Sequence, residues 1–145
     1  MAYKALDIAN KIIKSVSDSG LGDLISNLKL QKLLYYQQGF HLAYFGTPLF
    51  DEELEAWMYG PVVPSVYNQF KPEKQNPLYY SGEVICLAPK EEALFSEVMR
   101  VYGEFSAVGL MNMTHRETPW KETQVGTGNV IEKSKLQSFF KKKLK

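Results

Sequence analysis

Apolar residues near the start of the chain recur at helical spacing, and this recurrence is the strongest constraint on the fold. The residues that share it are Ala5, Ile8, Ala9, Ile12, Ile13 and Val16. They stand at i, i+3, i+4, i+7, i+8 and i+11, which predicts an amphipathic helix with a single apolar stripe. Ser17 to Gly22 (SDSGLG) carries the residues that end such a helix.

A second helix is predicted from a cap at Ser26 to about Phe45, before Gly46. The residues expected on one of its faces are Leu30, Leu33, Leu34, Gln37, His41 and Tyr44. Because His41 shares a face with leucines, we expect it to lie in or beside the interior as a hydrogen-bonded packing residue.

The segment after this helix predicts a small β element. Short apolar patches flank the acidic Asp51–Glu53, so a hairpin with arms Leu49–Phe50 and Leu54–Met58 is expected. The carboxylates of this acidic run are read as a solvated edge that guards a short strand. Glu83–Leu87 is a further candidate strand.

The rest of the chain reads as short helices and loops. Proline and serine signals predict helices that begin near Pro64, Pro89 and Ser106, a turn at Thr118-Pro119, and a last helix that buries Leu136, Phe139 and Phe140. The predicted fold class is mainly α (α+β). We expect a compact single-domain bundle of five to six helices, with a small β-hairpin or short sheet inserted after the second helix.

Length and composition favour one globular domain over residues 1–145, since 45% of the residues are hydrophobic and 23% are charged. The N-terminus lacks the pattern of a signal peptide and no apolar run reaches bilayer length, so we expect a cytoplasmic protein with no membrane partner. The single cysteine, Cys86, is expected to be a buried hydrophobe.

Charge gives little support for a nucleic-acid partner. The formal net charge is +1, and the exception is a basic tail formed by Lys141, Lys142, Lys143 and Lys145. A DNA-binding autorepressor is therefore a third-ranked hypothesis.

The stretch MTHRETPW, residues 113–120, is the densest in chemically capable side chains. His115-x-Glu117 matches half of the nucleoside-deaminase pattern, but the downstream P-C-x-x-C is missing, and so is an H-E-x-x-H pair. We therefore predict no catalytic, cofactor or metal site and no enzyme. A small hydrolase that uses His115 and Glu117 stays open as the alternative.

The structural interpretation of this stretch is a junction between two helices. Thr114 and His115 would bind the free carbonyls at the end of one helix, and Glu117 would bind the amides that open the next turn. Pro119 would start that turn and the Trp120 ring would clamp the junction.

Aromatic residues are unusually frequent before residue 81 and indicate a protein-binding surface. Tyr35 and Tyr36 are neighbours on a helix, about 100° apart, so one of them is expected to reach the surface. The candidate partner-binding residues are Tyr35, Tyr36, Phe40, Trp57 and Tyr59, which would edge a groove between the second helix and the hairpin.

Four segments together resemble one known family. They are KLQKLLYYQQGFHLAYFGTPLF (29–50), EAWMYGPVVPSVYNQF (55–70), VYGEFSAVGLMNMTH (101–115) and THRETPW, which ends at Trp120. In this order and spacing they resemble the Panacea domain family, also described as SocA-like or GepA-like phage-associated proteins. The structural positions of this motif are Gly39, Gly60, Pro61, Thr114, His115, Glu117, Pro119 and Trp120.

The resemblance implies an antitoxin of a prokaryotic or phage type II-like toxin–antitoxin pair, which would bind and neutralise a toxin encoded beside it. The family pairs one domain with toxins of unrelated folds. Its SocA-like branch implies an alternative, a proteolytic adaptor that delivers the toxin to a ClpXP-type protease. Homo-oligomers are a further possibility that the resemblance leaves open.

Overall fold

A computed structural model describes residues 2–18 and 25–144 of the 145-residue chain. Its helices are α1 (Ala5–Asp18), α2 (Asn27–Phe45), α3 (Pro64–Phe70), the 3₁₀ turn η1 (Lys71–Glu73), α4 (Pro89–Tyr102), α5 (Ala107–His115), α6 (Thr118–Lys121) and α7 (Lys133–Lys141). Its strands are β1 (Leu54–Trp57), β2 (Gly60–Val62) and β3 (Val130–Ile131). The predicted mainly helical α+β fold class is confirmed. None of the helices in these ranges is both long and apolar enough to cross a membrane.

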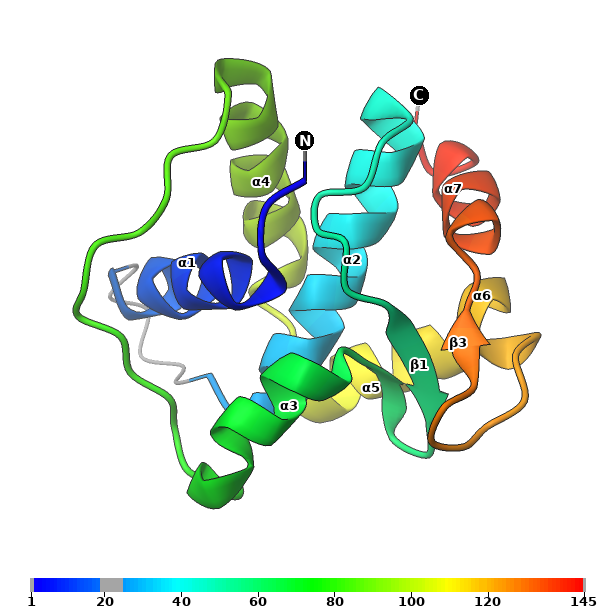
Figure 1. Ribbon diagram of the computed structural model, residues 1–145, viewed down its shortest axis with the longest axis horizontal. Coiled ribbons are helices and arrows are strands. Elements are labelled where there is room, and N and C mark those ends of the chain that lie inside the picture. The colour runs from blue at the N-terminus through cyan, green and yellow to red at the C-terminus, as the bar shows by residue number, and fades with distance from the viewer. Residues whose placement is uncertain (1, 19–24, 145) are drawn as a thin grey trace.

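Helix α2 is the centre of the fold. Figure 1 shows it between α1 and α4 on one side and α7 on the other, with α5 and the small sheet near its N-terminal end. The buried core draws its side chains from these helices and from the segment around Leu49 and Phe50. The other elements are therefore arranged around one helix.

The first two helices have the predicted limits. In α1 the residues Ala5 to Ile13 of the predicted stripe are buried. Ser26 caps α2 by accepting a hydrogen bond from the amide of Lys29, and Gly46 ends it with φ 76° while its amide donates to the Leu42 carbonyl. Of the predicted stop segment after α1, residues 19–22 lie outside the described residues.

Polar side chains of α2 are buried as well, which the single-face prediction missed. Gln31 accepts from the amide of Val63 at 2.9 Å, and Gln38 accepts from Leu49 and donates to the Phe50 carbonyl. At the far end Tyr44 is exposed, although the predicted stripe included it. Because α2 is surrounded by protein, its amide side chains satisfy the backbone of the neighbouring loops.

The hairpin has one predicted arm and one different arm. β1 pairs with β2. The predicted arm Leu49–Phe50 is therefore wrong. Phe50 instead forms a parallel bridge with Tyr3. The change follows from the turn, because Met58 and Tyr59 link the strands and Gly60 takes φ 107°, a backbone region that suits glycine. β3 completes the antiparallel sheet in the order β2-β1-β3.

Two further expectations were wrong, and a third was incomplete. Residues 83–87 form no strand, and Cys86 is exposed instead of buried. The acidic run is also more than a solvated edge. Glu52 accepts from the amide of Ala5 at the start of α1, Glu53 pairs with Lys133, and Glu55 accepts from the Trp57 indole at 2.9 Å. Glu52 and Glu53 thus join the sheet region to the first residues of α1 and α7.

Candidate functional site

Glu117 joins the MTHRETPW stretch to the central helix. Its side chain is buried, and its two oxygens accept hydrogen bonds from the hydroxyls of Tyr35 (2.9 Å) and Tyr36 (3.0 Å). The predicted bonds from Glu117 to the amides of the next turn are absent from α6, whose cap has no side-chain hydrogen bond. Burial raises the pKa of Glu117, while the two tyrosine hydroxyls lower it in part.

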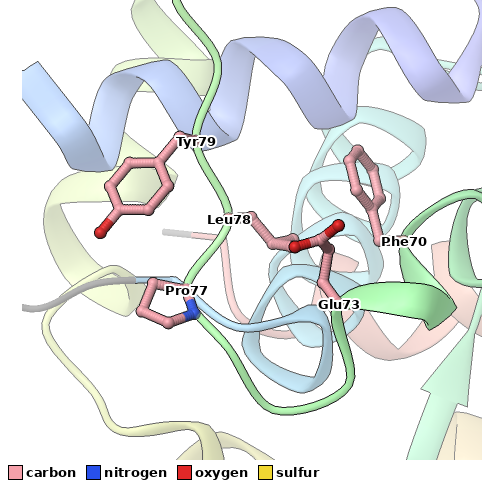
Figure 2. A pocket seen from close by; sticks show the side chains of 5 residues that line it. All are labelled: Phe70, Glu73, Pro77, Leu78 and Tyr79. Carbon is pink, nitrogen blue, oxygen red and sulfur yellow. The ribbon is translucent and has the colours of Figure 1, made fainter.

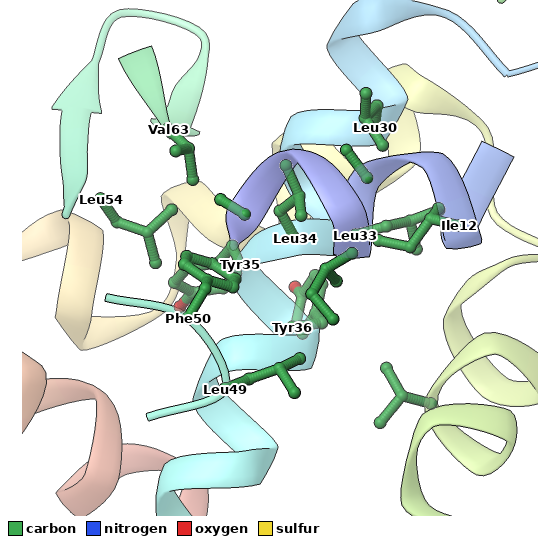
Figure 3. Close-up of a cluster of buried hydrophobic side chains, with 14 of the residues drawn as sticks. Ile12, Leu30, Leu33, Leu34, Tyr35, Tyr36, Leu49, Phe50, Leu54 and Val63 are labelled. Atoms are coloured by element: carbon green, nitrogen blue, oxygen red, sulfur yellow. The ribbon is translucent and has the colours of Figure 1, made fainter. Parts of the chain in front are cut away.

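Tyr35 and Tyr36 are both inaccessible to solvent, so the expectation that one of them reaches the surface is wrong. Figure 3 shows their rings inside the apolar cluster. Tyr36 stacks on Tyr102 at 4.2 Å between ring centroids, and Tyr35 meets the ring of Phe140 edge-on. Two faces 100° apart are both covered because protein surrounds α2. Burial, followed by the charge of Glu117, raises the pKa of both hydroxyls.

Because Tyr35 and Tyr36 are buried, they do not line the predicted groove between α2 and the hairpin. Phe40 is half-buried against Phe140, and Trp57 is half-buried against Tyr67. Of the five candidate partner-binding residues, Tyr59 is the exposed one.

Three side chains hold the backbone of the hairpin turn, and we call them the turn clamp: Lys32, His115 and Trp120. The Trp120 indole donates to the carbonyl of Trp57 at 2.8 Å, and the Lys32 amine donates to the carbonyl of Pro61 at 2.8 Å. The His115 imidazole hydrogen-bonds the backbone of Met58. The clamp thus brings residues of α2, α5 and α6 onto one turn.

Packing around the clamp explains two further positions of the motif. A Cβ atom on Gly60 would lie 2.7 Å from Cε of Lys32 and 2.9 Å from Oγ1 of Thr114, so only glycine leaves room for both. The Thr114 hydroxyl donates to the carbonyl of Met111, inside α5, and His115 binds the hairpin, so the predicted bonds of these two side chains to the free carbonyls at the helix end are wrong. The rings of His115 and Trp120 stack at 4.1 Å.

Burial determines the electrostatics of the clamp. Lys32 is fully buried, and this burial lowers its pKa to about 7. Burial also lowers the pKa of His115, the bond to Met58 opposes this effect, and the nearby Lys32 lowers it further. The Nε2 atom of His115 is buried without a hydrogen-bond partner. Each of these side chains is thus held in an environment that disfavours its charged form.

His115 and Glu117 have separate partners in this fold. Glu117 binds the tyrosines of α2, whereas His115 stacks on Trp120 and binds the hairpin. Within residues 2–18 and 25–144, no three His, Cys, Asp or Glu side chains are grouped to hold a metal ion.

The other histidine has a structural environment, as predicted. Nδ1 of His41 contacts the carbonyl of Thr47 at 2.6 Å, and Nε2 contacts Glu91 at 2.6 Å. Glu91 also accepts from the hydroxyl of Tyr3. Burial alone would raise the pKa of Glu91, but the hydrogen bonds from Tyr3 and His41 bring it below its usual value. This cluster links the N-terminal segment, α2 and α4.

The profile of the family described as "Antitoxin SocA-like, Panacea domain" matches residues 30–121. The chain belongs to this family. A curated relative, Antitoxin SocA of Caulobacter vibrioides (strain NA1000 / CB15N), is 35% identical over 119 residues. The alignment covers 72% of this chain and 62% of the relative, so the chain spans less than two-thirds of that protein's length. No solved structure matches.

The Panacea segment contains the whole turn clamp, and the positions of the motif converge on the hairpin and the core of α2. Lys32 was missed as a site residue, and the signal was its place between buried leucines in the second helix. Met58 was also missed. It stands beside Tyr59, directly before Gly60-Pro61, which marks an exposed turn.

A shallow hollow of about 250 Å³ lies elsewhere on this Panacea domain (Figure 2). Its lining residues are Phe70, Glu73, Pro77, Leu78 and Tyr79. Its wall combines the Glu73 carboxylate and the Tyr79 side chain with three apolar side chains. Phe70, the last residue of the 55–70 family segment, lines it, but none of the structural positions of the motif does. We therefore place the candidate functional site at the hairpin.

Proposed function

We propose that this Panacea domain is an antitoxin that neutralises a toxin encoded beside its own gene by binding it directly. The observation that carries the proposal is the 35% identity with Antitoxin SocA over most of this chain. The separate structural partners of His115 and Glu117 agree with a role that depends on the surface of the protein. The target of such an antitoxin is the protein product of the toxin gene, and the antitoxin would recognise that protein through its surface.

Co-expression tests this function. The neighbouring open reading frame is expressed alone and together with this chain, and growth is followed. We expect the neighbour to arrest growth alone and to be harmless in the presence of the antitoxin, with which it should co-purify as a complex. A neighbour that stays toxic beside well-expressed, folded antitoxin would contradict the proposal.

The same assay separates direct binding from delivery to a protease. In a strain that lacks the ClpXP-type protease, a directly binding antitoxin still protects and the amount of toxin is unchanged. Protection that disappears in that strain, with toxin accumulating, would instead identify the chain as an adaptor.

A further inference from the structure

The hairpin presents two large apolar side chains to solvent. Met58 is 67% exposed and Tyr59 is 62% exposed, and together they are the two turn residues between β1 and β2. We call this pair the tip. Single exposed apolar residues are ordinary on protein surfaces. Two adjacent exposed apolar residues on a turn that three side chains of the turn clamp bind need a specific explanation.

The turn clamp fixes the backbone on both sides of the tip. The carbonyls of Trp57 and Pro61 accept from the Trp120 indole and the Lys32 amine, and His115 interacts with the backbone of Met58. The donors come from α2, α5 and α6, which are separate in sequence. The tip is thus tied to the core instead of projecting as a free loop.

Stability alone is a poor explanation for the clamp. A fully buried lysine costs free energy because it loses its hydration, and an apolar side chain of similar length would fill the same space without that cost. What the Lys32 amine adds is a directed bond to the carbonyl of Pro61, 2.8 Å away. The arrangement suits a device that positions the turn.

A fixed turn is suited to partner binding. Ordering a mobile loop on association costs free energy, and a loop that is already ordered avoids most of that cost. Tyrosine combines a large apolar ring with a hydrogen-bonding hydroxyl, and methionine adapts to irregular apolar surfaces. Tyrosine in particular is frequent among the residues that carry most of the binding energy of interfaces.

The surface beside the tip extends this apolar character along α5. His115 touches the turn, and residues one and two helical turns before it lie on the same side of the helix. These are Met111, which is half-buried, and Val108, which is exposed. An apolar row of this length matches a protein surface better than a small molecule.

We propose that Met58 and Tyr59 form the anchor by which this domain enters an apolar pocket on its toxin, with Val108 and Met111 contacting the rim. This inference rests on the proposed antitoxin function and names its surface. The pocket requires apolar walls and a polar group within reach of the Tyr59 hydroxyl. The proposed partner is the toxin and not a second copy of the chain. Two tips that face each other would bury far less than the ~800 Å² per partner of a stable interface.

The test compares tip variants with matched variants at other exposed tyrosines. Tyr59→Ser and Met58→Ser/Tyr59→Ser are made beside Tyr44→Ser and Tyr79→Ser, whose side chains are 60% and 70% exposed. We expect the tip variants to keep the wild-type melting temperature and to lose toxin affinity by about 30-fold or more, with loss of protection in cells. The two controls should bind and protect like the wild type.

A second variant tests the clamp itself. Trp120→Phe removes the indole donor to Trp57 but keeps a ring that can stack on His115. We expect faster amide hydrogen exchange at residues 58–60 and about a fivefold to tenfold loss of toxin affinity, with the tip side chains intact. A purely structural role would lower the melting temperature without changing affinity at temperatures where the variant is folded.

The outcomes separate the two proposals. If the wild type protects and the double tip variant protects equally well, the anchor is wrong and the antitoxin function stands. Light scattering in the absence of toxin measures the oligomeric state of the variants. If the tip variants change this state and leave protection intact, the tip binds a second copy of the chain and the anchor proposal is overturned. If the wild type itself neither binds nor protects, both proposals fail.

Discussion

Glu117 is one carboxylate shared by two buried hydroxyls, and each of its oxygens has one tyrosine partner. Glu117→Gln replaces one acceptor oxygen by an amide that donates, so one tyrosine loses its acceptor. We expect the free energy of unfolding to fall by about 1 to 3 kcal/mol, the usual cost of a buried hydrogen-bonding group without a partner. Urea denaturation of the variant measures this loss.

The control is Glu122→Gln, five residues further along at an exposed position. It should change the free energy of unfolding by less than about 0.5 kcal/mol. Equal and small losses at both positions would mean that the bonds from Glu117 to the tyrosines add nothing to stability.

Lys32 predicts how stability depends on pH. Its pKa is about 7 in the fold against 10.5 for an unperturbed lysine, so between these values the unfolded chain holds one more proton. The free energy of unfolding should therefore rise with pH across this window. Below pH 7 the amine is charged in both states, and the full cost of burying the charge applies.

The measurement is urea denaturation at pH 7 and pH 9.5 for the wild type and for Lys32→Met, which keeps the apolar stem without the charge. We expect the difference between the two proteins to shift by about 3 kcal/mol in favour of the wild type at the higher pH. Titrating groups that do not interact with Lys32 cancel in this comparison. Parallel pH profiles would show that the amine is solvated in the fold.

At the scale of single residues, the sequence predicted the helix start in the MTHRETPW stretch but not which residues its side chains contact. Thr118-Pro119 marks a helix start by local rules, and α6 begins at Thr118. The partners of Glu117 lie 82 and 81 positions away, and no spacing rule reaches that far. Tyr35 and Tyr36 were misjudged because their burial depends on how many elements surround α2.

Between elements, the contact of α2 with α7 depends on a glycine. A Cβ atom on Gly39 would lie 2.1 Å from the Phe140 ring, which is buried in the core. We expect Gly39→Ala to lower the free energy of unfolding by about 1 to 3 kcal/mol, since the ring or the helix must shift. This cost exceeds the gain in helix propensity from alanine, about 1 kcal/mol.

A double-mutant cycle identifies the cause. Phe140→Leu removes part of the ring that would clash, so the loss for Gly39→Ala combined with Phe140→Leu should be smaller than the sum of the single losses. Additive losses would place the effect of Gly39→Ala elsewhere. Thermal denaturation of the four proteins provides the comparison.

Elements whose limits depend on local signals were predictable. Ser26, Gly46, Pro64, Pro89 and Ser106 stand at the helix ends where the sequence placed them. The pairing of β1 was not predictable, because the acidic residues resemble a turn while two of them bind α1 and Lys133 instead. A strand of two residues, β3, leaves no readable pattern.

For the molecule as a whole, α7 is expected to be indispensable. Leu136 and Phe140 are buried in the core, and α7 packs on α2, which also contacts α1, α3, α4, α5 and β2. A chain that ends at Glu132 should lose cooperative unfolding and near-ultraviolet dichroism, because the side of α2 that carries Gly39 becomes exposed.

The matched full-length variant is Lys141→Ala/Lys142→Ala, which changes two exposed residues at the end of the same helix. It should unfold like the wild type to within about 0.5 kcal/mol. A shortened chain that still unfolds cooperatively would show that α7 is an appendage to the domain.

The bonds of the turn clamp end on main-chain oxygens, which every amino acid possesses. None of them uses the side chain of Met58 or Tyr59. Substitutions at these two positions therefore leave the clamp in place while changing the surface that the tip offers. Under the anchor proposal, these two exposed residues set which partner the domain binds, and the interior that holds the turn stays the same when they change.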